Sequence, residues 1–433
     1  MEPTALMPLA ASIGLDWGDQ CHDIALQVTG TTTVETVRLV HNPAAIATWL
    51  RTLAQRFGGA PIGLAVETSR GPIVHALLEA PFLVLYPINP RSLCRLREVF
   101  SPNGAKDDMP DAELLLALLV QHRDKLRPWT PDATDTRTLR ALVQHRRAVV
   151  ALRTQLTNQL QAVLKAYFPQ ALQWAGAELS TPMACHFLVR WPTLAALQRA
   201  RAATVRQFYT GHHCRRPERI AERLAAIAEA VPLTRDPAII EPNALYAQLL
   251  ARQLLALGPE LARLEQTIAA RFAAHPDATV FASIPGAGAA FAPRLLVAFD
   301  SDRAQCPTAT DMQQRAGIAP IVIRTGRRPG VRAPRPEEVH WRWMTSTFLR
   351  QTFHEFAQHS LAQCDWARRF YHQQRQRGKP HHAALRSLAY KWIRILWRCW
   401  HDHIPYDDAR YERALRDRHS PIAAHLAPVP VAA

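Results

Sequence analysis

The stretch from Ser12 to Val28, SIGLDWGDQCHDIALQV, restricts the possible folds more than any other part of the chain. Apolar and polar side chains alternate up to Asp16, the turn residues Gly18-Asp19 follow, and a second alternating run then begins. Such a pattern predicts two antiparallel strands joined by a short turn. An acid at the end of a buried strand is either a turn or cap residue or a functional carboxylate. Asp16 alone leaves both interpretations open.

The first 130 residues continue as a predicted α/β layer. Three strands form a meander and two more alternate with helices, which gives the order βββαβαβα, the arrangement of ribonuclease-H-like domains. The predicted strands are Ile13–Asp16, His22–Val28, Val34–Val40, Ile62–Val66 and Phe82–Ile88. The predicted helices open at Asn42-Pro43, Gly71-Pro72 and Asn89-Pro90, and the last one is Asp111–His122.

Residues 131–277 are predicted to form a helical arm. Apolar residues recur every three or four positions along Arg137–Tyr167 and again along Leu250–Phe272, so we expect two long helices that pair as a hairpin or coiled coil. Gly258-Pro259 is expected to kink or split the second helix, because proline lacks the N–H that the helical hydrogen bond needs. Six prolines interrupt the segment between the helices, about 170–245, which is predicted to be an irregular helical insertion.

Residues 278–405 are predicted to form a second, mostly helical domain, followed by an irregular tail at 406–433 that trails off in Pro and Ala. The glycines of Phe281–Phe299, Gly286 and Gly288, resemble the hairpin of helix–hairpin–helix modules, where backbone N–H groups approach a phosphate. A plain packing corner is the alternative. A helical run through Gln313–Ala319 leads into an extended segment, Ile321–Thr325, and a loop rich in Pro and Arg. Further helices are predicted at Phe348–Ser360 and His381–Trp400.

Charge indicates the class of partner. The chain of 433 residues has a formal net charge of +16, and 16 Lys and Arg against four Asp and Glu lie between Arg324 and Arg398. This excess favours a polyanion, nucleic acid before membrane, although an Arg-rich proteome would produce a similar excess. The seven cysteines include no CxxC pair, which argues against a disulfide framework and a zinc site. With neither a signal peptide nor an apolar run near the ~20 residues of a membrane span, a cytoplasmic protein is expected.

Three further acids lie where a carboxylate can converge on Asp16. Glu67 follows the predicted fourth strand, which neighbours the first in this fold, and Asp108 and Asp111 lie one turn apart at a helix start. Each acid alone is also explained as a cap or turn residue. Four clustered carboxylates would repel one another unless cations were bound, and their oxygens suit two Mg²⁺ or Mn²⁺ ions. Two such ions can stabilise both oxygens of a phosphodiester displacement.

The same acids lie in segments that resemble a known family. IGLDWGDQCHDIAL, LAVETSRG and AKDDMPDAELLLALL resemble motifs of the DEDD transposases, a bacterial insertion-sequence group called the IS one-ten family. IPGAGAAFAPRLLVAF, AGIAPIVIRTGRR and HWRWMTSTFLRQTFHEFA resemble the second domain of that family. The resemblance covers nearly the whole chain. It implies that Asp16, Glu67, Asp108 and Asp111 form a metal site on a domain similar to the RuvC junction resolvase.

The resemblance also implies a hydroxyl nucleophile. The family has a serine followed by glycine shortly after an A-G-[LI]-x-P stretch, and this chain has Thr325-Gly326 there. A threonine hydroxyl can attack, but its methyl group crowds the approach and restricts χ1, so we expect a slowed or inactive copy. Arg324, Arg327 and Arg328 flank the site and suit phosphate contacts, with a solvated basic loop as the alternative. Ser346, beyond this loop, is a second candidate hydroxyl.

The function that the resemblance implies is DNA transposition, by a nucleoid-associated protein in the cytoplasm of a bacterium. Such an enzyme cleaves and rejoins donor and target DNA, works as a homodimer or homotetramer, and uses a structured guide RNA encoded by its element. The residues themselves indicate only a polyanion and do not distinguish RNA from DNA. One alternative is a metal-dependent nuclease of the junction-resolvase kind that forms no covalent link to DNA. The other is a catalytically decayed nucleic-acid-binding protein, which Thr325 favours.

Overall fold

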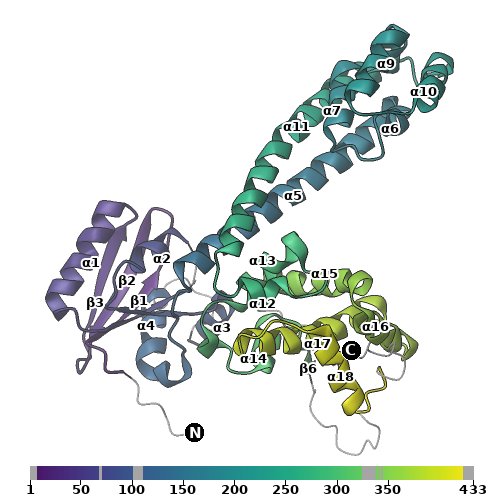
Figure 1. The fold of residues 1–433 in the computed structure, drawn as a ribbon. Helices are drawn as coiled ribbons and strands as arrows, with labels where there is room; N and C mark the ends of the chain where they lie inside the picture. The colour runs from purple at the N-terminus through teal and green to yellow at the C-terminus, as the bar shows by residue number, and fades with distance from the viewer. Residues whose placement is uncertain are drawn as a thin grey trace, which may run out of the picture. The chain divides into compact units, whose positions relative to one another are not determined.

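The computed structural model describes residues 7–67, 71–100, 111–323, 338–340, 342 and 345–422. The chain divides into two compact units, Met1–Pro131 and Asp132–Ala433. Figure 1 shows a sheet with helices in the first unit and an almost entirely helical second unit. No helix among the described residues is both long and apolar enough to cross a membrane. The predicted site residues that lie outside the described part are Asp108, Arg324, Thr325, Arg327 and Arg328.

The first unit is built on a five-stranded mixed sheet. Its strands are β1 (Ala11–Asp16), β2 (Cys21–Val28), β3 (Val34–Val40), β4 (Ile62–Val66) and β5 (Leu83–Pro87). Their order is β3-β2-β1-β4-β5, in which β1, β2 and β3 are antiparallel neighbours and β1, β4 and β5 are parallel. Every residue of β4 is buried, as expected for a parallel strand covered on both faces. The five predicted strands and the adjacency of the first and fourth are confirmed.

Helices cover both faces of the sheet. They are α1 (Pro43–Phe57), α2 (Pro72–Leu77), α3 (Pro90–Phe100), α4 (Asp111–His122) and the 3₁₀ helix η1 (Arg123–Lys125). Ile13 and Leu15 of β1 pack with apolar residues of α1 and α2, whereas Gly14 between them faces α4. Successive residues of a strand face opposite sides, so β1 serves both cores. The predicted opening of α1 is confirmed, because the Asn42 side chain accepts a hydrogen bond from the backbone N–H of Ala45 at 2.7 Å.

Two long helices form the arm of the second unit. α5 (Thr134–Tyr167) and α11 (Pro237–Ala273) lie side by side (Figure 1). Between them in sequence, five short helices enclose a core of their own with the far ends of α5 and α11. These are α6 (Ala171–Trp174), α7 (Pro182–Arg190), α8 (Leu194–Gln198), α9 (Ala202–Gly211) and α10 (Pro217–Glu229).

The expected split of the second arm helix is wrong. Pro242 and Pro259 both lie inside α11, which runs unbroken from Pro237. An internal proline costs about 3 kcal/mol of helix stability. Along α11 this cost is offset because Leu254, Leu261 and other apolar residues are buried. The same helix takes up the last nine residues of the predicted insertion, 237–245.

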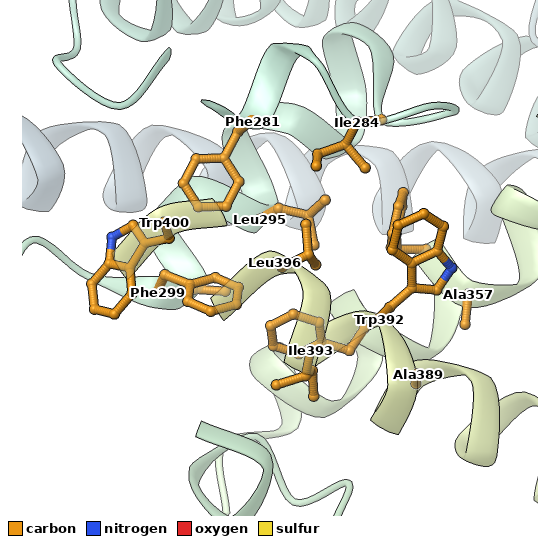
Figure 2. Close-up of a cluster of buried hydrophobic side chains, with 14 of the residues drawn as sticks. Phe281, Ile284, Leu295, Phe299, Ala357, Ala389, Trp392, Ile393, Leu396 and Trp400 are labelled. Carbon is orange, nitrogen blue, oxygen red and sulfur yellow. The ribbon is translucent and has the colours of Figure 1, made fainter. Parts of the chain in front are cut away.

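The remaining helices of the second unit share one apolar core. They are α12 (Ala278–Ala282), α13 (Gly288–Phe299), η2 (Arg303–Gln305), α14 (Ala309–Arg315), α15 (Thr347–Gln363), α16 (Asp365–Gln376), α17 (His381–His401) and α18 (Asp408–Asp417). Figure 2 shows Phe299, Trp392 and Trp400 among the side chains of this core, and none of the three is exposed. A short two-stranded sheet, β6 (Ile321–Ile323) with β7 (Glu338–His340), precedes α15.

Two expectations for this region are corrected. The helix predicted through Ala319 ends at Arg315, because Gly317 has a φ of +68° and its position beside Thr345 leaves no room for a side chain. The tail is not wholly irregular, since α18 occupies Asp408–Asp417. Tyr411 of α18 packs against the buried Trp366 ring, with centroids 4.9 Å apart. This tertiary contact has no counterpart in local sequence pattern.

Candidate active site: three carboxylates at the sheet edge

Asp16 and Glu67 lie at the same edge of the sheet. β1 ends at Asp16, β4 ends at Val66, and Glu67 is the next residue. The two strands are parallel neighbours in the register Leu15 opposite Val66. Because neighbouring strands are about 4.8 Å apart, this register sets the two acids beside each other at the carboxyl ends of the strands. The expected meeting of these two strand ends is therefore confirmed.

A close backbone contact brings Asp111 to this edge. A Cβ atom on Gly14 would lie 1.9 Å from the carbonyl oxygen of Ala112, so the backbone of α4 rests directly on β1. Asp111 is the first residue of α4 and immediately precedes Ala112. Any side chain at position 14 would push this helix end away. Gly14 thus sets the distance between α4 and the strand that carries Asp16.

The charges at this edge act on one another. Burial, followed by the nearby charges of Asp111, Glu67 and Asp23, raises the pKa of Asp16 to about 6. The positive charge of Arg97 opposes this rise. Three carboxylates that repel in this way favour a cation among them, and their oxygens match the donor preference of Mg²⁺ and Mn²⁺.

Arg97 of α3 is a member of this site that sequence reasoning missed. Its Nε donates a hydrogen bond to Asp111 Oδ1 at 3.0 Å, and its Nη2 forms an ion pair with Asp111 Oδ2. The hydrogen bond to Asp111 raises the pKa of the Arg97 guanidinium. Nothing in the sequence distinguished this arginine among the 52 Lys and Arg of the chain. The pair arises because α3 and α4 pack together, although the residues are 14 positions apart.

The carboxylate oxygens at this edge suit a divalent cation, but the described side chains are not arranged as a complete set of metal ligands. Among the described residues, no group of three or more His, Cys, Asp and Glu side chains could by itself hold a metal ion. Asp111 is turned to Arg97, and Asp108 lies outside the described range. A cation bound to Asp111 would have to replace at least part of the Arg97 contact.

The candidate residues of the second unit are described only in part. Gly286 has a φ of +77°, and a Cβ there would lie 3.2 Å from Gln363 Cβ, so this turn packs against α15. Gly288 begins α13 with a φ of +49° and has open space beside it. Phosphate contact by either glycine stays a prediction. Ser346 is the N-cap of α15, where its hydroxyl accepts from the Leu349 N–H at 3.5 Å.

Family comparisons cover both halves of the chain. Residues 13–169 match the family model of the DEDD transposases of IS110, and residues 278–373 match the model described as the transposase IS116/IS110/IS902 family. The chain belongs to the IS110/IS116 transposase family. The first match includes Asp16, Glu67, Asp108 and Asp111, and the second includes Thr325.

Members of the IS110/IS116 family resemble the chain over most of its length. A transposase predicted for the IS117 mini-circle of Streptomyces coelicolor is 28% identical over 93% of this chain and 96% of its own. An uncharacterized 44.8 kDa protein of insertion element IS116 in Streptomyces clavuligerus is 27% identical over 89% and 93%. An uncharacterized 42 kDa protein of IS900 in Mycobacterium paratuberculosis is 26% identical over 86% and 91%.

Proposed function

We propose that this protein cleaves and rejoins DNA strands during transposition of an insertion sequence. The observation that carries the proposal is the convergence of Asp16, Glu67 and Asp111 at one sheet edge, where repulsion and burial raise the pKa of Asp16 to about 6. The strand order β3-β2-β1-β4-β5 supports a ribonuclease-H-like domain. Family membership supports DNA as the substrate.

The carboxylates and the hydroxyl have separate roles in this proposal. Asp16, Glu67, Asp108 and Asp111 would hold Mg²⁺ or Mn²⁺, whose positive charge stabilises the attacking and leaving oxygens at a phosphodiester. Thr325 would attack phosphorus through Oγ, forming one P–O bond while the bond to the leaving strand breaks. The threonine proton is lost and the leaving oxygen gains one, so the step balances. Arg324, Arg327 and Arg328 would hold the phosphates beside it.

The proposal includes two partners that follow from the family resemblance. One is a structured guide RNA encoded by the element, which selects donor and target DNA by base pairing. The other is a second copy of the chain in a homodimer or homotetramer, so that the acids of one copy and Thr325 of another form one site. The basic segment from Arg324 to Arg398 gives either nucleic acid a cationic surface.

A suicide-substrate assay tests this function. Purified protein is mixed with Mg²⁺, end-labelled donor DNA and RNA transcribed from the element, and each component is also left out in turn. We expect a covalent protein–DNA band that disappears in Thr325→Ala and in Asp16→Ala. Because serine lacks the crowding methyl group, Thr325→Ser should give more of this band than threonine.

Other outcomes would select another function. Cleavage that needs Asp16 but gives no covalent band would indicate a junction-resolvase-like nuclease. An inactive wild type that gains activity in Thr325→Ser would indicate a family member inactivated at its nucleophile. Full activity without added RNA would remove the guide from the proposal.

A further inference from the structure

The second unit contains a cationic cavity, and none of its described lining residues has a role in the proposed chemistry. The cavity has a volume of about 510 Å³ and is lined by the turn after α14, the first half of α15 and the first turns of α17. Arg350 and His354 of α15 are four residues apart, as are His382 and Arg386 of α17, so each helix presents two basic side chains on one face. The volume is sufficient for a nucleotide-sized ligand.

The two helices bring their histidines together. His354 Nε2 lies 3.4 Å from His382 Nδ1, and the two rings are stacked with their centroids 5.6 Å apart. Burial and the neighbouring His382, His381 and Arg386 lower the pKa of His354, while Glu355 opposes this shift. An anion in the cavity would reverse the effect of these positive neighbours, because it favours the protonated imidazole.

The cavity has an excess of positive charge. Glu355 is the one acid among the described residues that line it, and its carboxylate forms ion pairs with Arg294 at 2.8 Å and Arg147 at 3.2 Å. These two arginines come from α13 and α5 and do not line the cavity. Glu355 is therefore paired with two guanidinium groups from outside the described lining, which weakens its effect on the basic residues of the cavity.

The cavity wall leads directly into the segment that carries Thr325. Gly317 and Ile318 line the cavity, and Gly317 is fixed because a Cβ there would lie 2.2 Å from Thr345 Oγ1. From Ile318 the chain enters β6, which ends at Ile323, two residues before Thr325.

We propose that this cavity binds a phosphate group of the DNA strand, held by Arg350, His354, His382 and Arg386. The guanidinium groups provide the charge and fork geometry that phosphate oxygens require, and the imidazoles add N–H donors. The inference rests on the proposed function for the identity of the anion. It extends that function by assigning a DNA subsite outside the acidic edge and outside the loop that contains the nucleophile.

The test measures binding without chemistry. Fluorescence anisotropy of the full-length protein with a labelled duplex of the element's end, in EDTA and over a range of salt, reports affinity whether or not the protein cleaves DNA. Arg386→Gln is expected to weaken binding about fivefold and to reduce the salt slope by about one. Arg206→Gln removes the same charge from an exposed position of the same unit, outside the basic segment from Arg324 to Arg398, and should change affinity less than twofold.

A second variant and a pH series keep the inference testable if Arg386→Gln does not fold. His382 is exposed, so His382→Gln should fold and should weaken DNA binding. Wild-type binding should weaken from pH 6 to pH 8, because burial and positive neighbours lower the pKa of His354 and its imidazole then loses the proton that a phosphate favours. Equal affinities of wild type, Arg386→Gln and His382→Gln would overturn the DNA subsite. It would also be overturned if the variants bound the element's RNA less tightly but DNA normally. If the two variants bind DNA more weakly in EDTA, as expected, but the wild type does not cleave DNA, only the proposed function would be contradicted.

Discussion

The carboxylates of the first unit and the cations of the second are gathered by different kinds of structure. At the sheet edge, parallel register sets Asp16 beside Glu67, and Gly14 lets α4 add Asp111. In the cavity, the spacing of four residues along α15 and α17 collects the basic side chains. The rigid edge forces like charges together at a cost visible in the pKa of Asp16. The helical faces hold their charges at partly exposed positions, where burial and the neighbours His382, His381 and Arg386 lower the pKa of His354.

The largest expected effect is loss of DNA cleavage when an edge carboxylate is removed. Asp16→Ala should reduce strand cleavage by about 1000-fold or more, because it removes a group proposed to hold the cation at the reacting phosphate. Asp23→Asn is the matched control, since Asp23 also acts on Asp16 but is exposed on β2. Gel assays on labelled donor DNA measure both. Equal losses in the two variants would mean that total negative charge, and not the strand-end position, matters.

The next largest expected effect is a loss of stability when α4 is displaced from β1. Gly14→Ala places a methyl group on the Ala112 carbonyl, so α4 must shift and carry Asp111 with it. We expect about 1–3 kcal/mol of lost stability in urea unfolding, and weaker Mn²⁺ binding as well. Gly211→Ala is the control, because nothing lies within 4 Å of its added methyl. Unchanged stability of Gly14→Ala would show that the strand and helix are less tightly packed than described.

The charge repulsion at Asp16 should be measurable as a pH-dependent change in the free energy of unfolding. Its folded pKa of about 6 lies above the usual 3.8, so the folded protein binds the extra proton between these values. Stability from this group therefore falls as pH rises from about 4 to about 6. After allowing for solvent screening, Asp16→Asn should gain about 1 kcal/mol at pH 8 without metal and nothing near pH 4. A gain that did not depend on pH would exclude repulsion as its cause.

Replacement of the partly buried Lys391 in the second unit should change the free energy of unfolding by a smaller amount. Burial lowers the pKa of Lys391 to about 8, while the rings of Trp366 and Phe370 stand 5.5 and 4.8 Å from its Nζ. Because the folded pKa is depressed, wild-type stability should rise between about pH 8 and 10.5 relative to Lys391→Met. At pH 7 the variant should be slightly more stable than the wild type, by less than about 1 kcal/mol, because burial penalises the charge more than cation–π attraction stabilises it. A large loss at pH 7 would mean that the rings stabilise the charge more than burial penalises it.

The two regions also differ in how far sequence predicts them. Asp16 and Glu67 could be placed because strand ends follow alternation, and the fold's strand order makes the two strands neighbours. Arg97 could not, because its pairing with Asp111 depends on how α3 and α4 pack. The cavity could not be predicted either, because its basic residues come from two helices that are separate in sequence.

Local rules failed where tertiary contacts override them. Pro259 predicts a broken helix, yet α11 stays continuous while its apolar face is buried. The composition of the tail predicts irregular chain, but Tyr411 packs on Trp366 and α18 forms. In both places, the free energy that decides the structure comes from residues distant in sequence.

Direct metal titration tests the central claim that the sheet-edge carboxylates form one cation site. Calorimetry with Mn²⁺ should compare wild type, Asp16→Asn, Glu67→Gln, Asp111→Asn and Asp23→Asn at pH 7.5. The account predicts binding to wild type and to Asp23→Asn, and an affinity at least tenfold lower in the other three. Undiminished binding in those three variants, or none in the wild type, would contradict it.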